Sequence, residues 1–274
     1  MKIAIQFLAV IILFCSCNSK FGKVLKSKDN EYKYKVAEQY YAQKKWDKAS
    51  QLFEGLFPYV KGTARFEDMY YKYVYCAYNQ KDYLNAENLF KNYLESFPNS
   101  QRAEEVEFMR AFCFYKQSPK VELDQTSTAK AIALLQAFIN THAGSERDKE
   151  AASLIDQLHG KQELKELKAA QLYYNLGYYK AAAVAFGTLM DDYPESDKSD
   201  SYKLEVVKAY YKYAQMSVPE KQEERYRQVL TEEADFEDRF PQSSLLQQAQ
   251  EYKTLSTNNI KRIQDEQAKA TTRQ

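Results

Sequence analysis

Three segments of the sequence end in nearly the same way, with an aromatic residue, proline, any residue and serine. The copies are SFPNS at 96–100, DYPES at 192–196 and RFPQS at 239–243. The first two share a longer ladder, with alanine twelve residues and phenylalanine eight residues before the proline. Its members are Ala86, Phe90 and Pro98, then Ala182, Phe186 and Pro194. Segments that stop alike are built alike, so internal repeats are the first constraint on the fold.

Related ladders occur three more times, which gives five units. Their small or β-branched key residues are Ala49, Ala86, Ala131, Ala182 and Val229. A second small or β-branched residue lies twelve positions upstream in three of the units, at Ala37, Val74 and Ala170. Apolar residues at offsets of three, four and seven line one helical face, and two such faces joined by a turn form an antiparallel helix pair.

The repeated ending has a physical role at each position. The aromatic residue packs between helices, and proline stops the second helix of a pair because its ring clashes with the preceding turn. The following serine can accept a backbone N–H at the start of the next helix. In the third unit His142 and Ala143 replace the aromatic residue and proline, and in the fifth unit Glu233 stands where an aromatic residue is expected.

Composition agrees with helices. Only 7 glycines and 6 prolines occur in 274 residues, while 28% of the residues are charged. Alternating small and aromatic residues in helix pairs resemble the tetratricopeptide repeat over residues 31–243. The expected fold is all-α, a tetratricopeptide-type α-solenoid of about five helix-turn-helix repeats with a C-terminal helix. The net charge of +1 disfavours a nucleic-acid partner.

The first residues, MKIAIQFLAVIILFCSC, carry one lysine, an apolar run and then small residues at a cysteine. This pattern predicts a signal peptide over 1–16. The segment FCSC resembles a bacterial lipobox, which makes Cys17 the expected lipidation site, because the bulky Phe14 precedes the other candidate, Cys15. An ordinary signal peptide that happens to contain cysteines is the alternative. Residues 17–30, with four lysines, are expected to form a lipidated, solvated tether.

Cys76 and Cys113 stand alone on apolar stretches, without metal-ligand spacing. We expect two buried thiols rather than a disulfide, although an exported protein could form one. Paired acidic residues lie at helix ends or on wet faces, and neither His142 nor His159 has a nucleophile at a meaningful spacing. The sequence predicts no enzyme, no cofactor and no metal site.

The third unit holds the most specific match to a known family. Its sequence has the form YxxSPxxxLDQTxTxKAIxxLQxFI and resembles the third repeat of BamD, the outer-membrane assembly lipoprotein. The matching residues are Tyr115, Ser118, Pro119, Asp124, Gln125, Lys130, Ala131, Phe138 and Ile139. The fourth unit, from Lys165 to Ser196, is similar to the next repeat of the same family.

The resemblance implies a non-enzymatic subunit of the outer-membrane β-barrel assembly machinery. It would be anchored in the outer membrane by lipid and would face the periplasm. The implied partners are a BamA-like insertase, other Bam lipoproteins and unfolded outer-membrane β-barrel proteins. A tetratricopeptide lipoprotein that scaffolds another envelope complex, for peptidoglycan synthesis, secretion or motility, is the alternative, because repeat arrays are adaptable platforms.

Stacked helix pairs present a concave surface made by their first helices, which suits extended peptides. The repeat places nine candidate groove residues there: Tyr34, Glu38, Tyr41, Tyr71, Tyr75, Tyr78, Phe108, Phe112 and Tyr115. An aromatic groove could bind the aromatic-rich C-terminal strand of an unfolded barrel protein. The alternative is that most of these side chains only pack between neighbouring units.

An insertion interrupts the third unit, with Ser118, Pro119, Asp124 and Gln125 as candidate loop residues. Two interpretations stay open: a partner contact, or a structural plug in which Asp124 caps the following helix. The expected five-repeat domain covers 31–257. Residues 258–274 are polar and are expected to be a frayed or disordered tail.

Overall fold

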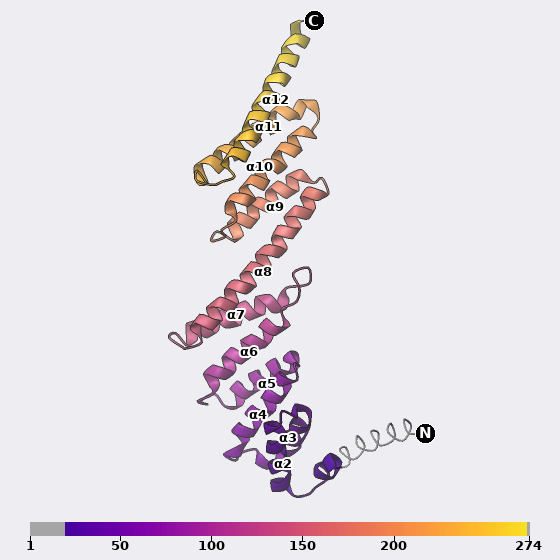
Figure 1. Ribbon diagram of the computed structural model, residues 1–274, viewed down its shortest axis with the longest axis vertical. Helices are drawn as coiled ribbons and strands as arrows, with labels where there is room; N and C mark the ends of the chain where they lie inside the picture. The colour runs from indigo at the N-terminus through magenta and orange to yellow at the C-terminus, as the bar shows by residue number, and fades with distance from the viewer. Residues whose placement is uncertain (1–19, 273–274) are drawn as a thin grey trace, which may run out of the picture. The chain divides into compact units, whose positions relative to one another are not determined.

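The computed structural model describes residues 20–272, and within this range the regular structure is helical (Figure 1). The helices are α2 (Asn30–Ala42), α3 (Trp46–Val60), α4 (Arg65–Asn79), α5 (Tyr83–Ser96), α6 (Ala103–Gln117), α7 (Thr126–Thr141), α8 (Asp148–Asn175), α9 (Tyr179–Asp192), α10 (Ser199–Gln215), α11 (Pro219–Arg239) and α12 (Leu246–Thr272). The chain forms two compact units, each made of several repeats, and the boundary between them follows Leu158, within α8.

The predicted helix pairs α2/α3, α4/α5, α6/α7 and α10/α11 are present, and α12 packs against α11 and α10. In the α8/α9 pair, Ala170 and Ala182 lie in one buried cluster. All five key residues of the ladders have no exposed surface: Ala49, Ala86, Ala131, Ala182 and Val229. A small side chain at this position lets the two backbones approach closely, and large neighbours then fill the space beside the crossing. The all-α, tetratricopeptide-type fold is confirmed.

The aromatic residue of each ending is the C-cap of its helix. Phe97, Tyr193 and Phe240 have φ between -133° and -128° and ψ between 50° and 64°. His142 adopts nearly the same conformation, with φ -118° and ψ 43°, and its ring lies 5.0 Å from that of Phe138. Proline disfavours the α-helical region in the residue before it, and these aromatic residues lie outside that region. His142 adopts this conformation without proline and serves as the aromatic residue of the third unit.

The serine of each ending makes two hydrogen bonds, one to the backbone of the following turn and one to a carboxylate. Its Oγ accepts the backbone N–H two residues later, at 3.0–3.2 Å, in Ser100, Ser145, Ser196 and Ser243. That N–H lies before the first helical residue. We had predicted that the serine caps the next helix; instead it orders the turn that precedes the helix. The same hydroxyl donates to a carboxylate on the first helix of the pair that is ending, at 2.5–2.6 Å. The acceptors are Glu67, Glu104, Glu163 and Asp200.

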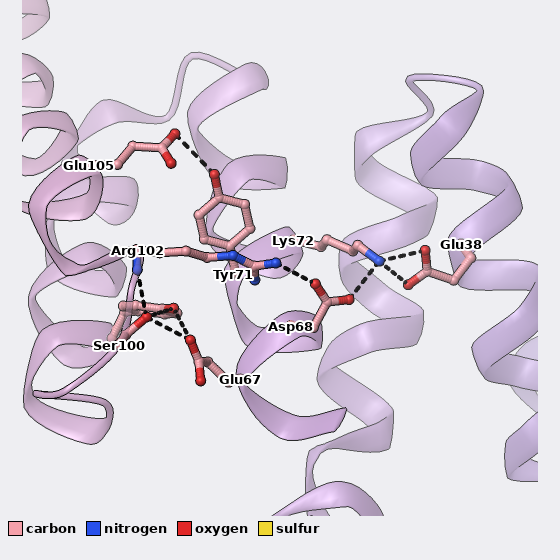
Figure 2. Close-up of polar contacts among 9 residues, drawn as sticks. Glu38, Glu67, Asp68, Tyr71, Lys72, Ser100, Arg102 and Glu105 are labelled. Carbon is pink, nitrogen blue, oxygen red and sulfur yellow. Dashed lines mark hydrogen bonds and ion pairs between the residues drawn. The ribbon is translucent and has the colours of Figure 1, made fainter. Parts of the chain in front are cut away.

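Two of these carboxylates also accept a tyrosine hydroxyl. Tyr93 donates to Glu67 at 2.8 Å, and Tyr202 donates to Glu163 at 2.5 Å. Figure 2 shows Glu67 beside Ser100 at the junction between the second and third repeats. Hydrogen bonds from Ser100 and Tyr93 hold the pKa of Glu67 below its ordinary value. Each of these four endings is therefore closed by a charge-assisted hydrogen bond.

The residues inserted between units enter the structure in different ways. The third unit carries its insertion as the loop between α6 and α7. The fourth unit lengthens its first helix, because α8 has 28 residues. In the fifth unit Glu233 stands at the aromatic position of the ladder, and Phe236, three residues later, is buried. Glu233 is also fully buried there, and its carboxylate lies 3.0 Å from the Nζ of Lys253 on α12.

Part of the expected tether packs against the protein instead of extending freely into solvent. Residues 20–25 are helical, and Phe21 and Val24 are buried in the core of the first repeat. The two side chains are three residues apart and lie on one face of the helical segment. The expectation of a solvated tether over 17–30 is therefore wrong for residues 20–25, because two apolar side chains dock this segment on the protein.

The expected domain end after residue 257 falls inside α12. This helix continues to Thr272, and Ile260 and Ile263 are buried with Val207, Tyr211 and Val229. The spacing of Ser256, Ile260 and Ile263 puts one residue per turn on the face that contacts the preceding pair. The expectation of a frayed or disordered tail is thus wrong up to Ile263, since packing orders that part.

Cys76 and Cys113 are free and have no exposed surface. They belong to separate clusters of the core, one in the first two repeats and one in the second and third repeats. Burial raises the pKa of both thiols to about 12. The two residues serve as small apolar side chains, as predicted.

The close crossing of α8 and α9 can be tested with adjacent alanines. Ala182→Leu should lower the free energy of unfolding by about 1–3 kcal/mol, because a buried crossing has no room for three more carbon atoms. Ala181 is exposed, and Ala181→Leu should change it by less than about 0.5 kcal/mol. Urea denaturation followed by circular dichroism measures both. Equal destabilisation would contradict the crossing.

The carboxylate of Glu67 should make stability depend on pH. Because its pKa in the folded protein lies below the ordinary value of 4.5, its contribution is complete above that value and is lost as the pH falls through the folded-state pKa. Glu67→Gln should be less stable than the native protein at neutral pH and should lose less stability between about pH 5 and pH 3. Thermal melts across this range measure the effect. Glu146→Gln, which removes an exposed carboxylate, should keep the native slope.

Candidate functional site

The predicted binding face belongs to α2, α4 and α6, the first helices of the first three repeats. Eight of its nine residues are half-buried: Tyr34, Glu38, Tyr41, Tyr71, Tyr75, Tyr78, Phe112 and Tyr115. Phe108 is only 1% exposed and packs edge-on against Phe138, with 5.5 Å between the ring centroids. The assignment of Phe108 to an accessible groove is therefore wrong. Phe108 is a core residue.

Several of the half-buried rings also pack within their own repeat. Tyr41 meets Phe53 at 6.2 Å, and Tyr75 meets Phe90 at 5.5 Å, both in edge-on contacts. Burial raises the pKa of Tyr41 to about 12, and burial together with a hydrogen bond to Glu105 raises that of Tyr75 still further. One side of each ring thus stabilises its helix pair, and only the other side can face a ligand.

An ion-pair ladder ties the three first helices together (Figure 2). The Nζ of Lys72 lies 2.8 Å from Glu38 on α2 and 2.7 Å from Asp68 on its own helix. Asp68 also accepts a hydrogen bond, at 2.9 Å, from the guanidinium of Arg102, which stands at the start of α6. Burial raises the pKa of Asp68, but the hydrogen bonds from Lys72 and Arg102 outweigh it and leave the value lowered. Asp68 is therefore charged at neutral pH and joins both neighbours.

Two tyrosines of α4 share one acceptor on α6. Tyr71 and Tyr75 donate to the same oxygen of Glu105, at 3.0 and 2.6 Å, and their rings lie 4.6 Å apart. The guanidinium of Arg102 stands 4.3 Å from the centre of the Tyr71 ring. A free tyrosine hydroxyl on a binding face could donate to the backbone of a bound peptide. In Tyr71 and Tyr75 the hydroxyl proton is already used inside the protein.

The α6 end of the face is built differently. Phe112 and Tyr115 stack at 5.4 Å with an angle of 15° between their rings. The Nζ of Lys116 lies 4.7 Å from the centre of the Phe112 ring, and the Tyr115 hydroxyl donates to Gln157 of α8 at 2.9 Å. These two half-buried rings form a flat apolar surface beside a positive charge.

The insertion loop is closed by one side chain. The amide nitrogen of Gln125 donates to the backbone oxygens of Lys120 and Leu123, at 2.9 and 3.0 Å, and its oxygen accepts from the buried Thr128 at 2.6 Å. Asp124 accepts the backbone N–H of Thr126, the first residue of α7, at 3.0 Å.

The remaining loop contacts extend this closure. The hydroxyls of Ser118 and Thr128 are 2.7 Å apart, and Pro119 is half-buried. These contacts fit the structural-plug interpretation. Leu123, at the tip, is 57% exposed, so a partner contact also stays a prediction.

Sequence reasoning missed the residues that hold the face together: Asp68, Lys72, Arg102 and Glu105. A signal for them exists. The pairs Glu38–Lys72 and Asp68–Arg102 are each 34 residues apart, as is the hydrogen-bonded pair Tyr71–Glu105. This separation equals the tetratricopeptide period, so complementary side chains one period apart predict contacts between neighbouring first helices.

Two further observations concern the membrane. Cys17, the predicted lipidation site, lies outside the described residues. Between residues 20 and 272, none of the helices combines the length and the apolar character needed to cross a bilayer.

Comparison with known proteins gives a family. The model of a family described as outer membrane lipoprotein, YfiO, matches residues 26–225, well over half of the chain. Among solved structures, the TPR2AB domain of yeast Sti1, in a complex with pHSP90, aligns with 83% of this chain and 97% of that chain, at 13% identity and a TM-score of 0.41. No curated protein sequence matches. The chain belongs to the YfiO (BamD) family of outer membrane lipoproteins.

Proposed function

We propose that this protein is the BamD-like subunit of the machinery that assembles β-barrel proteins in the outer membrane. It would act as a non-enzymatic scaffold that binds a BamA-like insertase, alongside other Bam lipoproteins, and receives unfolded barrel proteins. An acyl chain on Cys17 would hold it on the periplasmic side of the membrane. Family membership supports this role, and the accessible aromatic face of α4 and α6 is the observation that carries it.

The face suits an extended peptide because it is preorganised. Asp68, Lys72, Arg102 and Glu105 connect α2, α4 and α6, so binding a ligand would not have to order the helices. A rigid receptor loses less conformational entropy on binding than a flexible one. The ladder therefore favours recognition of a segment that itself arrives unfolded.

The geometry also indicates how such a segment would be recognised. The hydroxyls of Tyr71 and Tyr75 already donate to Glu105, so they are poor donors for a bound backbone. Phe112 and Tyr115 offer ring faces instead, with Lys116 beside them. Aromatic side chains near the C-terminus of an unfolded barrel strand would stack on these rings, and a terminal carboxylate would be attracted by the lysine.

The peptide-binding part can be tested with Phe112→Ser combined with Tyr115→Ser. Affinity for an aromatic-rich C-terminal peptide of a barrel protein should fall at least about tenfold, since tenfold corresponds to about 1.4 kcal/mol and the pair supplies two aromatic contacts. Fluorescence anisotropy of the labelled peptide measures it. We avoid Tyr75→Ala because Tyr75 packs on Phe90, and its loss would leave a cavity.

The matched control removes two exposed apolar side chains from the second helices of the first and second repeats. Tyr59 on α3 is 63% exposed and Leu84 on α5 is 65% exposed. Tyr59→Ser combined with Leu84→Ser should leave the affinity within about twofold, and circular dichroism should show native helix content in both variants. Equal losses of affinity in the two double variants would contradict a binding face on the first helices.

The partner part is tested by purification from the envelope. The protein should be extracted in mild detergent through a C-terminal tag, and a BamA-like barrel protein should accompany it in stoichiometric amount by mass spectrometry. A mock purification from untagged cells is the control. Recovery of peptidoglycan, secretion or motility proteins without an insertase would overturn the assembly role and favour a scaffold of that complex.

A further inference from the structure

Positive charge is concentrated at the N-terminal end of the protein. The whole chain has 39 basic and 38 acidic residues, yet residues 20–48 contain nine lysines against four acidic residues. Most of these lysines are exposed. A near-neutral protein therefore carries one strongly basic region, and it lies where the predicted lipid anchor joins the chain.

Two apolar contacts fold this region into one surface. Phe21 and Val24 are 7% and 6% exposed, and the ring of Phe21 meets that of Tyr40 edge-on at 5.7 Å. This contact brings residues 20–25 against the end of α2 and the start of α3. The Nζ of Lys48 lies 5.5 Å from the centre of the Phe21 ring, and that of Lys45 lies 5.7 Å from the centre of the Tyr40 ring.

We call Lys20, Lys23, Lys45 and Lys48 the basic corner. Two of these residues belong to the helical segment 20–25 and two to the start of the second helix of the first repeat, and the elements meet at the contact between Phe21 and Tyr40. The aliphatic stems of lysine can lie along apolar surface while the ammonium groups stay in water. The corner thus presents several positive charges at one place on a rigid support.

The covalent distance to the predicted anchor is short. Phe21 follows Cys17 by four residues, so an acyl chain on Cys17 would hold it within roughly 14 Å of the bilayer surface. A tether that stayed solvated up to α2, which starts at Asn30, would allow roughly 45 Å. Electrostatic attraction to anionic headgroups decays over about 8 Å at physiological ionic strength. The short connection therefore keeps the corner within about two such lengths of the surface, whereas the long one would let it move well beyond them.

From this geometry we infer that the first repeat docks on an anionic phospholipid surface through the basic corner. The inference rests on the proposed lipidation of Cys17 and adds an orientation to it. The acyl chain attaches the protein to the membrane, and the attraction between the lysines and the headgroups determines which face of the protein contacts the bilayer. The first repeat then lies directly on the membrane surface instead of being separated from it by a solvated tether.

The chain contains its own reporter for this contact. Trp46 is the one tryptophan in the sequence, begins α3 next to Lys45, and packs edge-on against Tyr41 at 5.2 Å. Energy transfer from Trp46 to dansyl-labelled lipid headgroups therefore measures how close the corner is to the bilayer. The full-length lipoprotein should be reconstituted into vesicles with and without phosphatidylglycerol, and the floated fraction should be measured at low and high salt.

The expected result is strong transfer in anionic vesicles that falls at high salt and in purely zwitterionic vesicles. Replacing the four lysines of the corner by glutamine should reduce the transfer at least about twofold, because each lysine near an anionic surface contributes to the attraction. Replacing them by arginine should preserve it. The control replaces four exposed lysines elsewhere by glutamine, at Lys120, Lys149, Lys180 and Lys261, and should keep native transfer.

Flotation separates failure of the anchor from failure of the docking. A protein that floats with both kinds of vesicle but shows the same low transfer in each has an anchor without docking, and this overturns the inference alone. A protein that floats with neither overturns the lipidation on which both proposals rest. Equal losses in the corner variant and in the control variant would show nonspecific attraction by net charge and would also overturn it.

Discussion

Close approach of two helices at a residue without exposed surface is the constraint on which the rest of this structure depends. At Ala49, Ala86, Ala131, Ala182 and Val229 the paired helices cross. The small side chain sets the distance between backbones, and the aromatic residues beside it fill the volume that this distance leaves. A larger side chain would separate the helices and remove the packing partners of every neighbouring ring.

Polar contacts then connect one pair to the next. In the second to fifth pairs, the serine that follows the aromatic C-cap donates to a carboxylate of the same pair and accepts from the backbone of the following turn, so one hydroxyl links three segments. In the first three repeats, the ladder through Lys72, Asp68 and Arg102 adds a second connection along the first helices. Partly buried charged groups of this kind are costly to separate, and they define a single arrangement of neighbours.

The two proposals use different parts of the compact unit that ends at Leu158. Aromatic rings on α4 and α6 would meet an unfolded partner, while lysines around Phe21 would meet the lipid surface. The same packing supports both, because Phe21 lies in the core cluster of the first repeat that also contains Ala37, Ala49 and Phe53. A binding face that is rigidly joined to a membrane-docked corner would be presented in one orientation, which is useful for a scaffold that transfers a chain to an insertase in the same membrane.

The sequence by itself determined the helix pairs, their crossing residues and the C-cap aromatics, because these depend on spacing within one or two helices. It also determined the family, through the insertion between Ser118 and Gln125. Tertiary structure decided the rest. Phe108 is buried whereas Phe112 and Tyr115 are accessible, and Tyr71 and Tyr75 converge on Glu105, because exposure and hydrogen bonding depend on which helix arrives from the neighbouring repeat. The same reason explains why residues 20–25 and the stretch up to Ile263 are ordered: their few apolar side chains find a partner only once the repeats have assembled.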